Sequence, residues 1–127
     1  MQLRVRAGEL ESERQWAYAW LAHDGVVYVG ATTLHPATRT WLHLHHDDPD
    51  IGRIAARYPE ARQSDLDVLA LALSDDVDRQ HVRHGAVALL AERGLLSDRH
   101  VCDPPLAAPP TPQADELVAV VEERLRA

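Results

Sequence analysis

The segment from Trp16 to His46 contains residue types that can do chemistry in an unusually neutral setting. Its only formal charges are Asp24 and Arg39, and five histidines accompany them: His23, His35, His43, His45 and His46. Arg39 and His43 are four positions apart, which places both side chains on one face of a helix. Because the whole chain has a net charge of −7, this neutral, histidine-rich stretch is a candidate site, whatever its ligand.

Metal binding is one chemistry that the histidines suggest. On a helix, His43, His46 and Asp47 share a face, and His81 and His84 lie one turn apart further along the chain. Neither group has the strict spacing of a zinc motif. The sequence therefore favours a solvated helix end for the first group and pairing with nearby aspartates for the second.

The composition indicates one small globular domain. The chain has 127 residues, of which 46% are hydrophobic and 26% charged, close to globular averages. Its single cysteine, Cys102, cannot form an internal disulfide, and no stretch resembles a membrane span or a secretory signal. We therefore expect a cytoplasmic protein without membrane contact. The 20 acidic residues against 13 basic ones disfavour a nucleic-acid partner, since such proteins normally present a basic face.

The candidate residues lie on a predicted hairpin and the helix after it. Residues 16–22 and 26–30 are rich in strand-favouring side chains, and the Asp24-Gly25 pair between them is typical of a tight turn. A helix is predicted over 36–46, because Pro36 suits a first turn and Thr33 or His35 can cap it. The three tryptophans are expected in the core, since the chain has no phenylalanine: Trp16, Trp20 and Trp41.

Further elements follow from the rest of the pattern. A short helix is predicted over 51–58 with Asp50 as its cap, and a strand covered on both faces over the nearly continuous apolar stretch 65–73. A third helix begins after Ser74-Asp75-Asp76 and ends near Gly94.

The two ends of the chain are predicted to lie outside this domain. Residues 1–15 form a short edge strand or a loose arm, and 103–112, with five of the eight prolines, form a stiff linker. A last helix over 113–126 has an apolar stripe that packs on its own domain or contacts a partner or second copy.

In this order of elements the chain resembles the GIY-YIG endonuclease family. Trp16-Ala17-Tyr18 takes the place of the first family motif and keeps its tyrosine, and Tyr28-Val29-Gly30 matches the second. The tyrosines are ten positions apart, a spacing that the family uses, and Arg39 and His43 match the arginine and histidine of its next helix. The resemblance implies an α+β fold: a small three-stranded antiparallel sheet flanked by helices, in the order β-β-α-α-β-α, over 16–102. The helix within 113–127 is an addition to it.

The same resemblance implies metal-dependent hydrolysis of a phosphodiester in nucleic acid. It assigns Tyr18 or Tyr28 to the attacking water, Arg39 to the phosphate oxygens, and His43 to the relay or orientation of protons.

The glutamate that holds the metal in this family is missing. Its place in the third predicted helix falls near Arg83, His84 or Gly85. A divalent ion (magnesium, manganese or zinc) is therefore expected only if the chain is active, with His84 as the ligand for a softer ion.

Three hypotheses remain open. The first, a nuclease with an altered site, predicts a basic strip of Arg39, Arg53, Arg57 and Arg83. The second, a non-catalytic binding or adaptor protein, predicts a dimer or partner contact that buries Val118 and Leu125. The third, an enzyme for a small molecule, predicts a closed pocket that holds Tyr18, Tyr28, His43 and His84.

Overall fold

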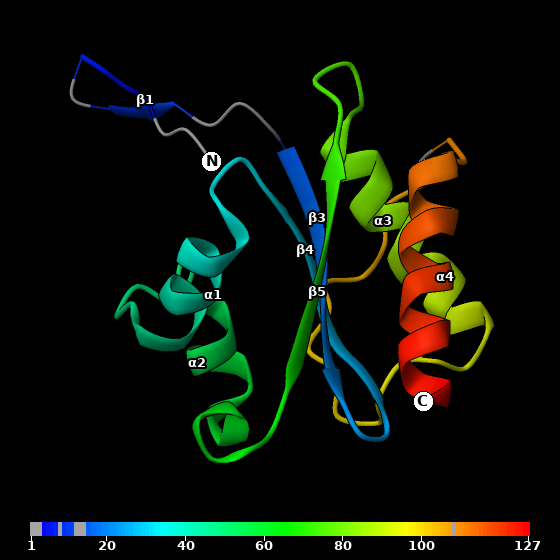
Figure 1. Ribbon diagram of the computed structural model, residues 1–127. Coiled ribbons are helices and arrows are strands. Elements are labelled where there is room, and N and C mark those ends of the chain that lie inside the picture. The colour runs from blue at the N-terminus through cyan, green and yellow to red at the C-terminus, as the bar shows by residue number, and fades with distance from the viewer. Residues whose placement is uncertain (1–3, 8, 12–14, 108) are drawn as a thin grey trace.

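A computed structural model describes residues 4–7, 9–11, 15–107 and 109–127 of the chain (Figure 1). Its centre is an antiparallel sheet in the order β4-β3-β5, formed by β3 (Gln15–Ala22), β4 (Gly25–Thr32) and β5 (Asp67–Leu73). The predicted α+β fold and its order of elements are confirmed.

The N-terminal segment forms a small hairpin of its own. β1 (Arg4–Arg6) pairs with β2 (Glu9–Glu11) in a two-stranded sheet separate from the main one. Residues 1–3, 8 and 12–14 of the predicted arm, and residue 108 of the predicted linker, lie outside the described residues.

The β3–β4 hairpin sets the register of the candidate site. Gly25 in the turn has a φ of 145°, and a Cβ there would lie only 2.7 Å from the backbone oxygen of Leu95, so the turn requires glycine. The register pairs Tyr18 with Gly30 and Trp20 with Tyr28, and a bulge follows Trp20. Both motif tyrosines therefore lie on the same face of the sheet.

Two helices and a 3₁₀ turn cover that face. α1 (Pro36–His45) begins at the predicted place, where the His35 side chain caps it by accepting a hydrogen bond from the backbone N–H of Ala37. α2 (Arg53–Arg57) begins later than predicted, after Gly52, and has no side-chain cap. The prediction of Asp50 as its cap was wrong, because Asp50 belongs to a turn in which its own N–H donates to Asp48. η1 (Pro59–Gln63) continues the chain as a 3₁₀ helix.

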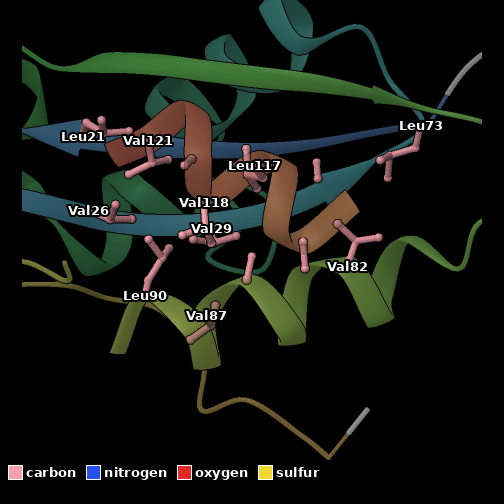
Figure 2. Packing of buried hydrophobic residues seen from close by; sticks show 14 residues of the cluster. Leu21, Val26, Val29, Leu73, Val82, Val87, Leu90, Leu117, Val118 and Val121 are labelled. Carbon is pink, nitrogen blue, oxygen red and sulfur yellow. The ribbon is translucent and has the colours of Figure 1, made fainter. Parts of the chain in front are cut away.

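α3 (Arg79–Glu92) and α4 (Pro112–Arg126) cover the opposite face of the sheet (Figure 1). Asp78 caps α3 and Thr111 caps α4, each through its side-chain oxygen. The core on this side is aliphatic and includes residues of both helices, among them Leu90 and Leu117 (Figure 2). Of the two contacts predicted for the last helix, the structure contains the intramolecular one, since Val118 is fully buried within the chain.

The strand predicted within residues 65–73 is confirmed as β5, but the prediction that it is covered on both faces was wrong. β5 is an edge strand that pairs with β3, and its Ala70 and Ala72 are exposed. Its leucines face the aliphatic core, whereas the smaller alanines alternate with them on the other face. The run is continuous in apolar type but alternates in side-chain size.

The tryptophans differ from the expectation in one case. Trp20 is buried and Trp16 is half-buried against the ring of His35, with the ring centroids 6.1 Å apart. Trp41, however, is 59% exposed, because it lies on the outer side of α1 beside His45. The core prediction was therefore wrong for Trp41.

Among the described residues, the helices are too short and too polar to cross a bilayer.

Candidate functional site

Tyr18, Tyr28 and His43 meet between the sheet and α1. A hydrogen bond of 2.6 Å joins the Tyr18 hydroxyl to Nε2 of His43. The His43 ring centroid lies 5.7 Å from that of Tyr18 and 5.2 Å from that of Tyr28. All three side chains are at most 3% exposed, so this group is buried. Three of the residues predicted from the sequence thus lie in direct contact.

Gly30 provides the space that this contact needs. It lies opposite Tyr18 on the neighbouring strand, and a Cβ at Gly30 would be 2.3 Å from the Tyr18 hydroxyl oxygen. Only a residue without a side chain allows the Tyr18 ring to lie across β4 and reach His43. The glycine of the Tyr-Val-Gly motif is therefore explained by packing in this chain.

His43 is held in its neutral form. Burial is the main cause that lowers its pKa to about 3, and the positive charges of Arg39, Arg53 and Arg57 act in the same direction. The ring therefore carries no charge at physiological pH. Its second nitrogen, Nδ1, is buried and has no hydrogen-bond partner within the described part of the chain.

Tyr18 is likewise held in its neutral form. Burial raises the pKa of its phenol, and the neighbouring Tyr28 adds to the effect, whereas Arg39 and Arg53 oppose it. A phenol with a raised pKa is a poor base at neutral pH. The hydrogen bond therefore joins a neutral phenol to a neutral imidazole, and neither member is ionised in the folded protein near neutrality.

Arg39 lies at the edge of this buried group. Its Nη1 donates a hydrogen bond of 2.7 Å to the backbone oxygen of Ile51, and its charge acts on both Tyr18 and His43. Among the described residues, neither Asp24 nor Asp47 forms an ion pair with Arg39; Asp24 instead accepts a hydrogen bond from Ser97. Arg39 thus ties α1 to the start of α2 beside the tyrosines.

Three further arginines converge on one carboxylate next to the buried group. Asp103 lies 2.7 Å from Arg57, 3.2 Å from Arg83 and 3.8 Å from Arg53. The same Nη1 atom of Arg53 donates to the Tyr28 hydroxyl at 3.1 Å, which connects this surface cluster to the buried tyrosines. Hydrogen bonding with Tyr28 is also the main cause that raises the Arg53 pKa. We call Arg53, Arg57 and Arg83 the arginine cluster.

The sequence predicted the arginines of this cluster but not the aspartate at its centre. It grouped the arginines with Arg39 as a test for nucleic-acid binding, but it gave Asp103 no role beyond the first position of a linker. One feature of the sequence could have indicated a role for Asp103: this acidic residue stands directly before Pro104 and Pro105, which stiffen the chain after it. The contact itself spans 20 to 50 residues of sequence and becomes visible only in the fold.

The residues present do not fit a hard divalent ion. Near the position that the predicted resemblance gives to the metal-binding glutamate, Arg83 points to Asp103, and His84 accepts a hydrogen bond from the backbone N–H of Leu106. The Asp103 carboxylate is already neutralised by arginines, and their charges repel a cation. Within the described residues, no group of three or more histidine, cysteine or acidic side chains is arranged to hold a metal. His84 also lies apart from Tyr18, Tyr28 and His43, so the four do not share one pocket.

Comparison of the chain with protein-family models, with characterised proteins and with solved structures finds no match.

Proposed function

We propose that this chain is a divergent GIY-YIG-like protein that binds nucleic acid through its phosphate groups. The observation that carries the proposal is the convergence of Arg53, Arg57 and Arg83 beside the tyrosines in a chain whose net charge is −7. A basic strip that includes Arg39 is the feature expected of a nucleic-acid ligand, and the convergence of the other three arginines on one place supports that expectation. Guanidinium groups bind phosphate oxygens in pairs, and their charge supplies most of the affinity.

Binding without metal-dependent cleavage is the form of this function that the site supports best. The position that the resemblance gives to the metal ligand falls near Arg83, His84 or Gly85, none of which is a carboxylate, and the Asp103 carboxylate beside Arg83 is engaged by arginines. A cluster with surplus positive charge attracts an anion and repels a divalent cation.

Fluorescence anisotropy with labelled single-stranded, duplex and branched DNA and with RNA tests the proposal. Arg57→Gln removes one cluster charge and is expected to weaken binding by roughly tenfold, the usual cost of one charge-assisted contact. Arg126→Gln is the matched control, since Arg126 lies on α4 across the sheet and its side chain is 75% exposed. Equal affinity of the two variants, or no binding by the folded wild type, would contradict the proposal.

Phosphodiester hydrolysis is the second candidate, favoured by the 2.6 Å bond between Tyr18 and His43. The bond aligns the phenol and imidazole to which the GIY-YIG resemblance assigns the proton transfer, and Arg39 beside them can neutralise developing charge on a phosphate. A cleavage assay on supercoiled and branched DNA with magnesium, manganese or zinc tests this candidate. Cutting by wild type that is lost in Arg39→Ala would support it; absence of cutting under every metal would leave the binding proposal alone.

A further inference from the structure

The segment that contains Asp103 is held by hydrogen bonds of its backbone before and after that residue. Before it, the N–H of Val101 donates to the backbone oxygen of Val27 on β4 at 2.7 Å. After it, the N–H of Leu106 donates to Nδ1 of His84 on α3 at 3.2 Å. We call residues 101–106 the strap. Both ends of the strap are fixed and two prolines follow Asp103. The strap therefore holds the Asp103 carboxylate between α2 and α3, against the arginine cluster.

The charges at this place do not balance. Among the residues that the structure describes, three guanidinium groups surround a single carboxylate, so two positive charges are left over. Arg53 and Arg57 come from α2 and Arg83 from α3, so two separate elements direct cations at one point. Bringing like charges together costs free energy, and a plain structural ion pair needs only one of them.

The ligand that matches this surplus is a phosphate monoester. A monoester carries a charge of about −1.5 to −2 at neutral pH and three terminal oxygens, whereas an internal phosphodiester carries a single charge. The site is also reachable from solvent, because the side chains of Arg53, Arg57 and Asp103 are 30%, 36% and 31% exposed, although that of Arg83 is only 14% exposed. We infer that the arginine cluster is a site for the terminal phosphate of a nucleic-acid strand, and that Asp103 occupies this site in the free protein as an intramolecular competitor.

This inference rests on the proposed nucleic-acid binding and adds which phosphate is bound and what opposes it. Entry of the terminal phosphate displaces the Asp103 carboxylate from Arg57 and Arg83. The strap keeps its backbone anchors at Val101 and Leu106. Nη1 of Arg53 contacts both Asp103 and the Tyr28 hydroxyl. A phosphate bound at the cluster would therefore lie one side chain away from the buried tyrosines.

The test compares a short single-stranded oligonucleotide with a 5′-phosphate and the same strand with a 5′-hydroxyl. Affinities for both probes are measured by anisotropy on the full chain as wild type, Asp103→Asn and Asp98→Asn. Asp98 is the matched control, because it is exposed, lies five residues before Asp103 and changes the net charge equally. We expect wild type to prefer the phosphorylated probe, and Asp103→Asn to bind that probe about tenfold more tightly, while Asp98→Asn changes by less than about twofold.

Arg83→Gln provides a second variant, since it removes one guanidinium and is expected to abolish the preference for the phosphorylated probe. Equal gains in Asp103→Asn and Asp98→Asn, equal gains for both probes, or a preference retained in Arg83→Gln would overturn the inference. Binding of both probes without preference by wild type overturns it while the proposed function stands. If the folded wild type binds neither probe, the proposed function fails and the inference fails with it.

Discussion

The two faces of the central sheet are built from different chemistry. The face under α3 and α4 packs alanine, valine and leucine side chains into one aliphatic cluster. The face under α1 and α2 buries tyrosines, a tryptophan and His43, and two ring nitrogens there, Trp20 Nε1 and His43 Nδ1, have no hydrogen-bond partner among the described residues. Buried polar groups lower stability unless they are paired. The aliphatic face therefore contributes most to the free energy of unfolding. The unpaired ring nitrogens of the polar face lower it, which suggests that the tyrosine–histidine group is kept for a function other than stability.

The largest expected effect comes from the aliphatic face. Leu117→Ala leaves a cavity beneath α4, where Leu117 is fully buried, and is expected to lower the free energy of unfolding by about 2–5 kcal/mol. Nucleic-acid affinity of the folded fraction should not change. Denaturant titration measures the first quantity and anisotropy the second; a loss of affinity as large as that of Arg57→Gln would show that the two faces are not separate in function.

The pH dependence of stability distinguishes the polar face from the aliphatic one, because only the polar face buries His43. As pH falls below about 6.5, the unfolded state protonates His43, while the folded state resists until its lowered pKa of about 3. The free energy of unfolding should therefore fall with a slope that approaches about 1.4 kcal/mol for each pH unit, or by roughly 2 kcal/mol between pH 6.5 and 4.5. His84, whose pKa is also lowered, contributes in the same direction, so wild type is compared with His43→Gln. Identical pH profiles for the two proteins would contradict the account of His43.

Gly30→Ala tests the packing of the polar face, because the only change is a methyl group next to Tyr18. The added methyl group would overlap the Tyr18 hydroxyl, so Tyr18 must move away from His43. We expect a loss of about 1–3 kcal/mol in the free energy of unfolding, as for other overpacked sites. Gly94→Ala serves as the contrast, since nothing lies near its Cβ position and its cost comes from its φ of 68°. A Gly30→Ala protein with unchanged stability and an intact tyrosine–histidine bond by NMR would exclude this reading of the glycine.

Tyr18→Phe removes a single hydrogen bond, and its expected effect is at most that of Gly30→Ala. It keeps the ring and removes the hydroxyl, which leaves His43 Nε2 without its partner. The free energy of unfolding should fall by about 1–3 kcal/mol if the nitrogen stays dry, and by about 0.5–1.5 kcal/mol if water replaces the hydroxyl. Thermal or chemical unfolding measures this loss. Any cleavage activity should disappear with the hydroxyl, and cleavage at the wild-type rate would remove Tyr18 from the chemistry.

Local patterns in the sequence were enough to predict the frame of the site. Asp24-Gly25 and Pro36 marked the hairpin and the first helix, and the spacing of Tyr18 and Tyr28 placed them on facing strands. Once these elements form, the contact of both tyrosines with His43 follows from register and helix face.

The features that were missed depend on contacts between distant parts of the chain. The exposure of Trp41 depends on how α1 is rotated on the sheet, and the edge position of β5 depends on strand order. Asp103 meets Arg57 across 46 residues of sequence, a distance over which no periodicity connects them. Sequence therefore indicated which arginines to examine, but not the carboxylate that brings them together.

The salt dependence of binding tests the central claim, that the arginine cluster beside the buried tyrosines is an anion site. The affinity of the wild type for a single-stranded oligonucleotide is measured over a series of salt concentrations, beside Arg57→Gln and Arg126→Gln. Three arginine–phosphate contacts predict a slope of log affinity against log salt of about −2, at about 0.7 per contact. Arg57→Gln should reduce this to about −1.4, while Arg126→Gln leaves it unchanged. A slope near zero, or the same slope in both variants, would contradict the account.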